Sequence, residues 1–170
     1  MIVRREGPAD VSVVRPIHVV AFDKGDGAEA VEARLLDELR ICDGWLPAFS
    51  LVAEVGGEVV GHAVCTRGFV GDVPGLGLGP IAVDPAVQRA GIGSALMHAM
   101  VGAADATGEP YVALLGSPVY YRRFGFVPST EVGIEPPDPR WAEHFQVRTL
   151  TAFDPSTRGA FRYASPFDNV

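Results

Sequence analysis

The most constraining feature of this sequence is a glycine-containing junction between an apolar strand and an apolar helix. Residues 81–83 read as the end of the strand, which Asp84-Pro85 stops because proline has no N–H to donate to a β-ladder. Gly91 and Gly93 stand where the helix begins, and glycine lets a backbone approach a bulky group closely. The free N–H groups of a first helical turn, together with the helix dipole, favour an anion. The junction therefore predicts a phosphate-binding cradle.

Composition limits the ligands that such a cradle can serve. The chain has 170 residues, 48% of them hydrophobic and 21% charged, which is ordinary for one globular domain with a good core. Its formal net charge of -7 argues against a nucleic-acid partner and gives no support for an anionic membrane surface. A local basic pair such as Arg122-Arg123 can still serve one small anion.

The cysteines and the N-terminus point to a cytoplasmic protein. Cys42 and Cys65 are far apart and have no metal-ligand spacing, so we expect two reduced thiols and no metal site. The N-terminal residues contain no apolar signal core, and no apolar run approaches the roughly 20 residues of a membrane span. We therefore expect no membrane partner.

The order of the predicted elements indicates one mixed α/β sheet with helices on both faces. Gly56-Gly57 between two β-rich runs predicts a hairpin, and Gly61 predicts a bulge or a close backbone approach. Alternating glycines at 75, 77 and 79 leave one strand face without side chains, which would give room for a ligand. The expected strands are 2–5, 49–54, 58–67, 79–83, 111–115, 126–127, 144–150 and 159–163, and the expected helices are 11–22, 29–42, 92–104 and 118–124.

Two local details belong to this prediction. Asp10 is the expected N-cap of helix 11–22, and Pro16 inside that helix predicts a kink or a split. Residues 69–74 are expected to form a loop.

The predicted cradle does not match the better-known phosphate loops. The GxGxxG pattern fails because Leu96 stands where its third glycine should be, and the P-loop ending is absent. The first strand carries no glycine fingerprint, which disfavours a dinucleotide fold. The pattern that fits is Gln88-x-x-Gly91-x-Gly93, which by itself also suits a tight strand-to-helix turn with no ligand.

A second motif, Tyr121-Arg-Arg-Phe-Gly-Phe126, follows after the next strand. In this order, and after the Gly-Gly hairpin, the two motifs resemble the GNAT superfamily of acyl-CoA-dependent N-acetyltransferases, and most of all its small bacterial, YhbS-like members. The resemblance covers residues 1–128 and implies a single mixed, mostly antiparallel sheet with a splayed pair of central parallel strands. Residues 129–170 would add C-terminal strands and a tail to one acyl-CoA N-acyltransferase domain of 170 residues.

The resemblance implies acetyl-CoA or coenzyme A as a cosubstrate and no metal. Loop amides would hold the pyrophosphate, and an open strand edge would pair with the peptide-like pantetheine arm. Strand amides would also polarise the thioester carbonyl. The residues expected to bind the cosubstrate are Ile81, Ala82, Val83, Gln88, Arg89, Ala90, Gly91, Ile92, Gly93, Ser94 and Ala95.

Tyr121 is the expected general acid for the leaving thiolate. A tyrosine pKa near 10 against a thiol pKa near 8.5 makes full proton transfer uphill by about 2 kcal/mol. Tyr121 would therefore act mainly as a hydrogen-bond donor unless Arg122, Arg123 or a helix terminus lowers its pKa. Tyr120 is an alternative whose spacing to Gly125 fits the motif less well.

The general base is the least determined part of the site, because the strand before the cradle carries no carboxylate. Three candidates stay open, Glu54, His62 and Asp72, each acting directly or through water, and Glu54 is named with Tyr121 as catalytic. His98, on the long apolar helix, is expected to be structural. The other two histidines, at positions 18 and 144, have no partners that the sequence reveals.

The leading interpretation is an N-acetyltransferase that moves an acetyl group from acetyl-CoA to a primary amine of a small molecule or protein, by direct attack in a ternary complex. The alternative is a non-catalytic acyl-CoA-binding or regulatory module, and a nucleotide-binding interaction protein is disfavoured because the nucleotide motifs fail. Residues 22–28, 69–75 and 129–141 are the expected walls of the acceptor site. The resemblance also allows a homodimer, on which no pattern in the chain bears.

Overall fold

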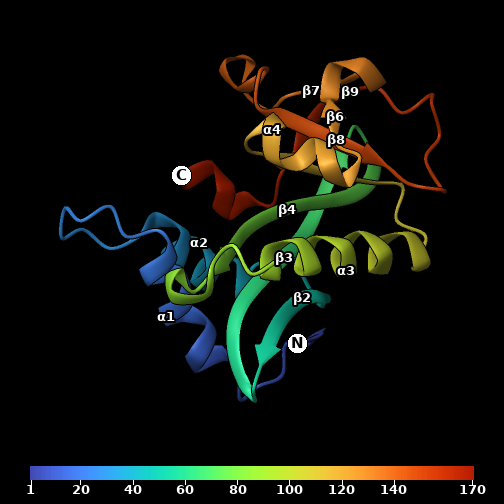
Figure 1. Cartoon of the computed structure of the whole chain (residues 1–170). Helices are drawn as coiled ribbons and strands as arrows, with labels where there is room; N and C mark the ends of the chain where they lie inside the picture. The colour runs from blue at the N-terminus through green and yellow to red at the C-terminus, as the bar shows by residue number, and fades with distance from the viewer.

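The computed structural model describes residues 1–170, which form an open, mostly antiparallel sheet covered by helices (Figure 1). The strands are β1 Ile2–Arg5, β2 Trp45–Val55, β3 Glu58–Val70, β4 Val73–Val83, β5 Tyr111–Leu115, β6 Val127–Pro128, β7 Ile134–Glu135, β8 Phe145–Thr149 and β9 Gly159–Arg162. The helices are α1 Val11–Ala21, α2 Val31–Arg40, α3 Ile92–Ala106 and α4 Pro118–Tyr121, with short 3-10 turns η1 Pro85–Val87, η2 Arg122–Phe124, η3 Ser129–Val132, η4 Pro139–Trp141 and η5 Ser165–Asn169.

The sheet order is β1-β2-β3-β4-β5-β8-β6, and β9 pairs with both β3 and β7. Its one parallel pair on this path, β4 with β5, lies at the centre and is short. The pairing runs only from Leu76 opposite Val112 to Leu78 opposite Leu114. Beyond Leu78 the two strands diverge, so the C-terminal part of β4 has no partner on the β5 side. The predicted splayed pair of central parallel strands is confirmed.

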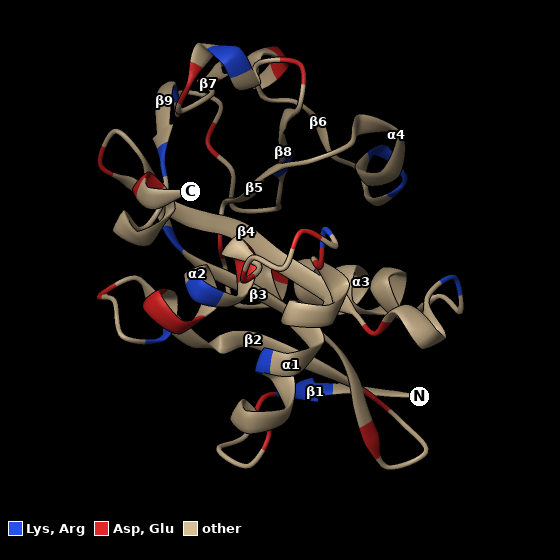
Figure 2. Cartoon of the chain, turned by 90° about the vertical axis from the view of Figure 1, so that its left-hand side faces the viewer, with Lys and Arg blue, Asp and Glu red and all other residues tan.

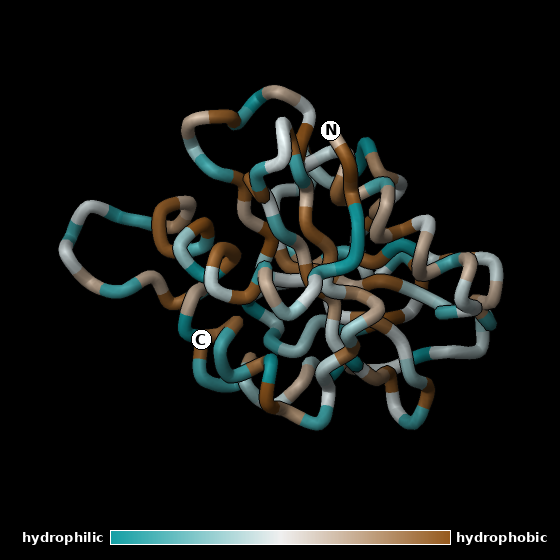
Figure 3. The backbone as a smooth tube through the Cα atoms, turned by 90° about the horizontal axis from the view of Figure 1, so that it is seen from below, coloured by the Kyte–Doolittle hydropathy of each residue, from teal (hydrophilic) through white to brown (hydrophobic).

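The helices cover the two faces of the sheet, as predicted. Figure 1 shows α1 and α2 on one side of the long strands and α3 on the other. One apolar cluster packs α3 residues such as Leu96 and Met100 against the sheet, and a second packs Val14 of α1 and Leu36 of α2 against the opposite face. In the tube of Figure 3, apolar segments run through the interior and hydrophilic segments gather in the protruding loops.

Several predicted boundaries are wrong in informative ways. The expected loop at 69–74 is a hairpin, because β3 continues to Val70 and pairs with Val73 at the start of β4. The expected helix at 118–124 keeps its predicted bounds but consists of one α-turn followed by a 3-10 turn. Strand β7 was not predicted at all. Pro16 neither splits nor ends α1, which is continuous from Val11 to Ala21.

Of the three alternating glycines of β4, only Gly79 leaves room for a ligand. A Cβ on Gly75 would collide with the ring of Tyr111, and one on Gly77 would lie 2.6 Å from the ring of Tyr163. At Gly75 and Gly77 the face is therefore filled by the chain's own aromatic rings, and the expectation is wrong there. At Gly79 a Cβ would meet nothing closer than 3.7 Å, and this residue lines a cavity. The other expectation about glycine is confirmed, since a Cβ on Gly61 would lie 3.1 Å from Ile92 of α3.

The start of α1 is fixed by charge rather than by a simple cap. Asp10 occupies the N-cap position, but its carboxylate makes no cap hydrogen bond. It accepts instead from the Arg4 guanidinium at 2.7 Å and from the Gly7 amide at 2.7 Å. The Arg4 hydrogen bond, aided by the Gly7 amide, lowers the pKa of Asp10 to about 2. These contacts tie α1 to β1.

Candidate functional site

The predicted cradle forms a groove of about 660 Å³ at the N-terminus of α3, which we call the glycine-loop groove. Gly91 is the N-cap of α3 with φ of 82°, a left-handed conformation that favours glycine. The helical bonds begin where the Ala95 amide donates to the Gly91 carbonyl at 2.9 Å, so the amides of residues 92–94 have no helical acceptor. The groove is lined by Ile81, Ala82, Val83, Gln88, Arg89, Gly91, Ile92, Gly93, Ser94, Tyr120 and Arg123.

The structure brings most of the predicted cosubstrate residues into this one groove and adds two. Ala90 and Ala95 do not line it, whereas Tyr120 and Arg123 do. The Arg123 guanidinium lies 4.8 Å from the centre of the Tyr120 ring. A Cβ on Gly93 would lie 2.9 Å from the Tyr120 hydroxyl, so glycine at this position admits that hydroxyl to the cradle. The sequence indicated the Arg122-Arg123 pair as a local basic site for a small anion. Of the two, only Arg123 lines the groove.

Gln88 lines the groove as expected, but its side chain also bonds to the protein's own backbone. Its side-chain amide donates to the Val83 carbonyl at 3.1 Å, which fixes the loop to the end of β4. Gln88 therefore shapes the groove as well as lining it. Beyond Leu78, β4 is still paired with β3 on one side. Its backbone groups on the other side face the gap left by β5 and, apart from the Val83 carbonyl, are open to a peptide-like partner.

A second cavity, of about 380 Å³, meets the glycine-loop groove at Ile81, the one residue that lines both. Its walls are mostly apolar, and five of its residues are aromatic, so we call it the aromatic pocket. It is lined by Phe22, Glu32, Leu35, Leu78, Gly79, Pro80, Ile81, Leu115, Tyr121, Trp141, Tyr163, Phe167 and Val170. Of the loops expected to wall the acceptor site, 22–28 contributes Phe22 and 129–141 contributes Trp141, while 69–75 contributes nothing.

The largest cavity, of about 870 Å³, lies elsewhere, between Ile41–Gly44 and the C-terminal segment. It shares Trp141, Tyr163 and Phe167 with the aromatic pocket. It shares no lining residue with the glycine-loop groove. Size alone therefore does not identify the site, whereas the junction at Ile81 joins two cavities of different character.

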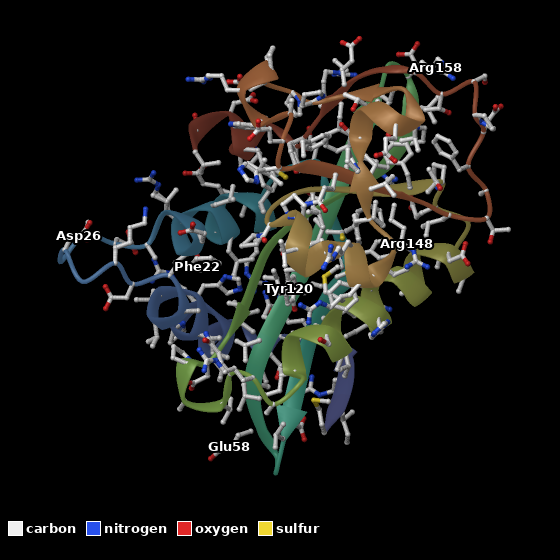
Figure 4. All side chains as sticks on the ribbon, turned by 45° about the horizontal axis from the view of Figure 1, so that its top comes forward. Phe22, Asp26, Glu58, Tyr120, Arg148 and Arg158 are labelled. Carbon is white, nitrogen blue, oxygen red and sulfur yellow. The ribbon has the colours of Figure 1, made fainter.

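The adjacent tyrosines of α4 face different cavities. Tyr120 lines the glycine-loop groove and Tyr121 lines the aromatic pocket. Figure 4 labels Tyr120 of α4 and Phe22, which follows the end of α1 and lines the aromatic pocket. The Tyr121 ring lies against Gly116, where any Cβ would collide with it. Burial, with a smaller contribution from Tyr120, raises the pKa of Tyr121 to about 12, so neither neighbouring arginine lowers it.

The geometry argues against two of the three candidate bases. Glu54 accepts from Arg4 at 3.1 Å at the β1 side of β2 and lines neither cavity. Asp72 is exposed in the turn between β3 and β4, and it also lines neither cavity. The carboxylate that does line the aromatic pocket is Glu32 of α2, which the sequence did not single out because nothing in the chain order links α2 to Ile81.

The third candidate, His62, belongs to a buried chain of hydrogen bonds. Its Nδ1 lies 2.9 Å from Nε2 of His18, and its Nε2 lies 2.9 Å from the Ser50 hydroxyl. Because the Ser50 hydroxyl donates to Glu6, it accepts from His62, and His62 Nδ1 then accepts from His18. Burial is the main cause that lowers the pKa of both histidines well below 6.5, so both rings are neutral near pH 7. This pair fixes α1 on the sheet, and the sequence could not reveal the partner of His18.

Comparison with known proteins identifies the family to which this fold belongs. Residues 47–128 match the model of the acetyltransferase (GNAT) domain. The uncharacterised N-acetyltransferase YjhQ of Escherichia coli K12 is 34% identical over 166 residues, which span 93% of this chain and 89% of YjhQ. The chain belongs to the GNAT family of acetyltransferases.

Solved structures of the family extend the likeness to the whole fold. The YhbS N-acetyltransferase of Escherichia coli, crystallised with CoA, superposes with a TM-score of 0.85 at 26% identity and covers 98% of this chain and 91% of its own. A GNAT acetyltransferase of Brucella melitensis in complex with acetyl-CoA has a TM-score of 0.79 at 30% identity, over 98% and 97% of the two chains.

Two further findings concern the molecule as a whole. None of its helices combines the length and the apolar character needed to cross a bilayer. No three histidine, cysteine, aspartate or glutamate side chains gather in a way that could hold a metal ion.

Proposed function

We propose that this chain is an acetyl-CoA-dependent N-acetyltransferase that acetylates a primary amine by direct attack in a ternary complex. One observation carries the proposal: a groove with phosphate-binding geometry and an apolar pocket meet at Ile81, with a tyrosine of α4 in each. The groove would take acetyl-CoA and the pocket would take the amine. Both reactants could then be bound at once, one in each of two cavities that follow one another along β4.

The glycine-loop groove suits the coenzyme in two ways. The free amides of residues 92–94 and the positive end of the α3 dipole favour the pyrophosphate, and Arg89 and Arg123 add positive charge. The open edge of β4 from Gly79 to Val83 offers main-chain groups to the pantetheine amides. The thioester would then lie near Ile81, where the second cavity begins.

The reaction needs a nucleophile, a polarised carbonyl and help for the leaving group. The neutral amine attacks the thioester carbon, strand amides stabilise the negative oxygen, and the C–S bond breaks to release the thiolate. With a pKa of about 12 for Tyr121 against a reference thiol pKa near 8.5, full proton transfer is uphill by about 5 kcal/mol. Tyr121 would therefore stabilise the thiolate as a hydrogen-bond donor.

Isothermal titration of the folded protein with acetyl-CoA and with CoA tests the first half of the proposal, and the expected result is saturable binding of both. A free-thiol assay with an amine panel tests the second half. Binding of acetyl-CoA without thiol release from any amine would replace the enzyme by an acyl-CoA-binding regulatory module. Absence of binding would remove both functions.

A further inference from the structure

The aromatic pocket carries one charged side chain among apolar walls. That side chain is Glu32, in the first turn of α2, and it faces a cavity whose other ionisable side chains are the tyrosines 121 and 163. Figure 2 shows that α2 bears several acidic and basic residues, yet only Glu32 lines this pocket. The pocket is therefore anionic at one point and apolar elsewhere.

The Glu32 carboxylate is incompletely satisfied. Glu32 is half-buried, and its Oε2 atom is shielded from solvent and has no hydrogen-bond partner. A shielded carboxylate oxygen without a partner is unfavourable, because charged groups lose solvation on burial unless a hydrogen bond or an opposite charge replaces it. An ammonium group in the pocket would supply both the charge and the N–H donors.

We propose that the acceptor is a small primary monoamine with an apolar or aromatic body, and that Glu32 binds its ammonium group; this inference rests on the proposed function. A cavity of about 380 Å³ lies at the small end of ligand-binding pockets. Aromatic rings such as Phe22, Trp141 and Phe167 can pack on the body of such an amine, and rings also attract its cation.

The same walls disfavour other classes of amine. A polyamine or an aminoglycoside has further ammonium groups, and the pocket has no second carboxylate side chain to pair with them. A peptide amine brings main-chain amides that need hydrogen-bond partners, which apolar walls do not provide. Charge complementarity thus selects one cationic group on an otherwise apolar molecule.

Glu32 also provides a destination for the amine proton. The ammonium gives one proton to the Glu32 carboxylate, and its nitrogen lone pair forms the bond to the thioester carbon. When the C–S bond breaks, the thiolate takes the second proton from the nitrogen by way of solvent, and Glu32 later returns its proton to solvent. The products are the N-acetyl amine, CoA thiol and one released proton.

The test is a free-thiol assay with saturating acetyl-CoA and four acceptors: phenylethylamine, spermidine, kanamycin and a short peptide with a free N-terminus. We expect kcat/KM for phenylethylamine to exceed that for the other three by at least 100-fold. Glu32→Gln should lower kcat/KM for phenylethylamine at least tenfold at neutral pH. The loss should shrink as the pH approaches the pKa of the amine, because the free amine needs neither an ion pair nor a proton acceptor.

Glu38→Gln is the matched control, since Glu38 lies on the same helix and outside the pocket. It should leave both kcat/KM and its pH dependence unchanged, and acetyl-CoA binding by both variants reports that they are folded. Preference for spermidine, kanamycin or the peptide would overturn the acceptor class and leave the acetyltransferase intact. Equal behaviour of Glu32→Gln and Glu38→Gln would overturn the role of Glu32. Thiol release from no amine, with acetyl-CoA bound, would instead overturn the proposed function.

Discussion

The two cavities that meet at Ile81 are built in opposite ways. The glycine-loop groove comes almost entirely from one continuous stretch, residues 81–94, and much of it is backbone. The aromatic pocket draws side chains from positions as distant as Phe22 and Phe167, on elements that only the sheet topology brings together. In the proposed function, the phosphate would be recognised by a local conformation, whereas the acceptor would be recognised by side chains that the fold must assemble.

Each cavity carries a charge opposite to that of its proposed ligand. The glycine-loop groove contains Arg89 and Arg123 and no carboxylate, although the whole chain has a net charge of -7. The aromatic pocket contains Glu32 and no cationic side chain. Each cavity therefore carries the charge that complements an anion or a cation, independently of the balance of the chain.

The largest expected effect is on kcat, and it distinguishes Tyr121 from Tyr120 of α4. Tyr121→Phe removes the proposed hydrogen bond to the thiolate, and kcat should fall on the order of 100-fold with unchanged affinity for acetyl-CoA. Tyr120→Phe should show the reverse pattern, because Tyr120 lines the glycine-loop groove. Steady-state kinetics and titration with acetyl-CoA measure both. If Tyr121→Phe weakens acetyl-CoA binding as much as it lowers kcat, the division between the cavities is wrong.

A smaller effect is expected from the loop itself. Gly91 has φ of 82°, so Gly91→Val introduces strain of roughly 1–3 kcal/mol that the loop would relieve by moving its amides. The affinity for acetyl-CoA should fall roughly tenfold. At a high concentration of acetyl-CoA, the variant should still acetylate an amine that is a substrate of the wild type.

Gly102→Ala is the control for this variant, because Gly102 lies inside α3 with open space around it. It should keep the affinity and raise the free energy of unfolding by about 1 kcal/mol. Unchanged affinity in Gly91→Val would show that the loop conformation does not hold the coenzyme.

The last prediction concerns stability rather than the reaction. On the side of the aromatic pocket, the buried pair His18–His62 holds α1 and thereby Phe22. Both histidines have a folded-state pKa below the unfolded value near 6.5, so acid protonates the unfolded chain first. The contribution of the two neutral histidines to the free energy of unfolding is fully present above about pH 6.5. Below that pH the free energy of unfolding should fall by up to about 1.4 kcal/mol per pH unit for each histidine.

Urea unfolding at pH 7 and pH 5 measures this slope. His18→Gln should be less stable at pH 7 but should lose less stability on acidification than the wild type. The exposed His98 provides the control, because His98→Gln should retain the wild-type slope. A wild-type slope in His18→Gln would exclude the buried pair as its source.

The sequence predicted the half of the site that is local. Gly91 and Gly93 reveal themselves by their spacing, since only a left-handed residue and a residue without Cβ suit their positions. The central splay also followed from the family resemblance. Tyr121 lines the same cavity as Ile81, and its assignment as the general acid stays a prediction. The sequence could not tell which cavity Tyr120 and Tyr121 each face, because both lie on one short helical turn.

The other half could not be predicted, and the reasons are specific. Glu32 reads as one more solvated charge of an amphipathic helix until α2 is placed beside Ile81. Glu54 looks available in the sequence, but its ion pair with Arg4 depends on the pairing of β1 with β2. The glycines of β4 indicated an empty face, and only the fold supplies the Tyr111 and Tyr163 rings that fill it.

The position of Tyr163 near the end of the sequence affects the order in which the two cavities can form during translation. All residues of the glycine-loop groove lie at or before Arg123. The aromatic pocket, by contrast, includes Trp141, Tyr163 and Phe167, and the Tyr163 ring seats on Gly77 of a strand made long before it. During translation the residues of the glycine-loop groove are therefore synthesised first. The aromatic pocket is complete only when residues 141–167 have packed onto β4.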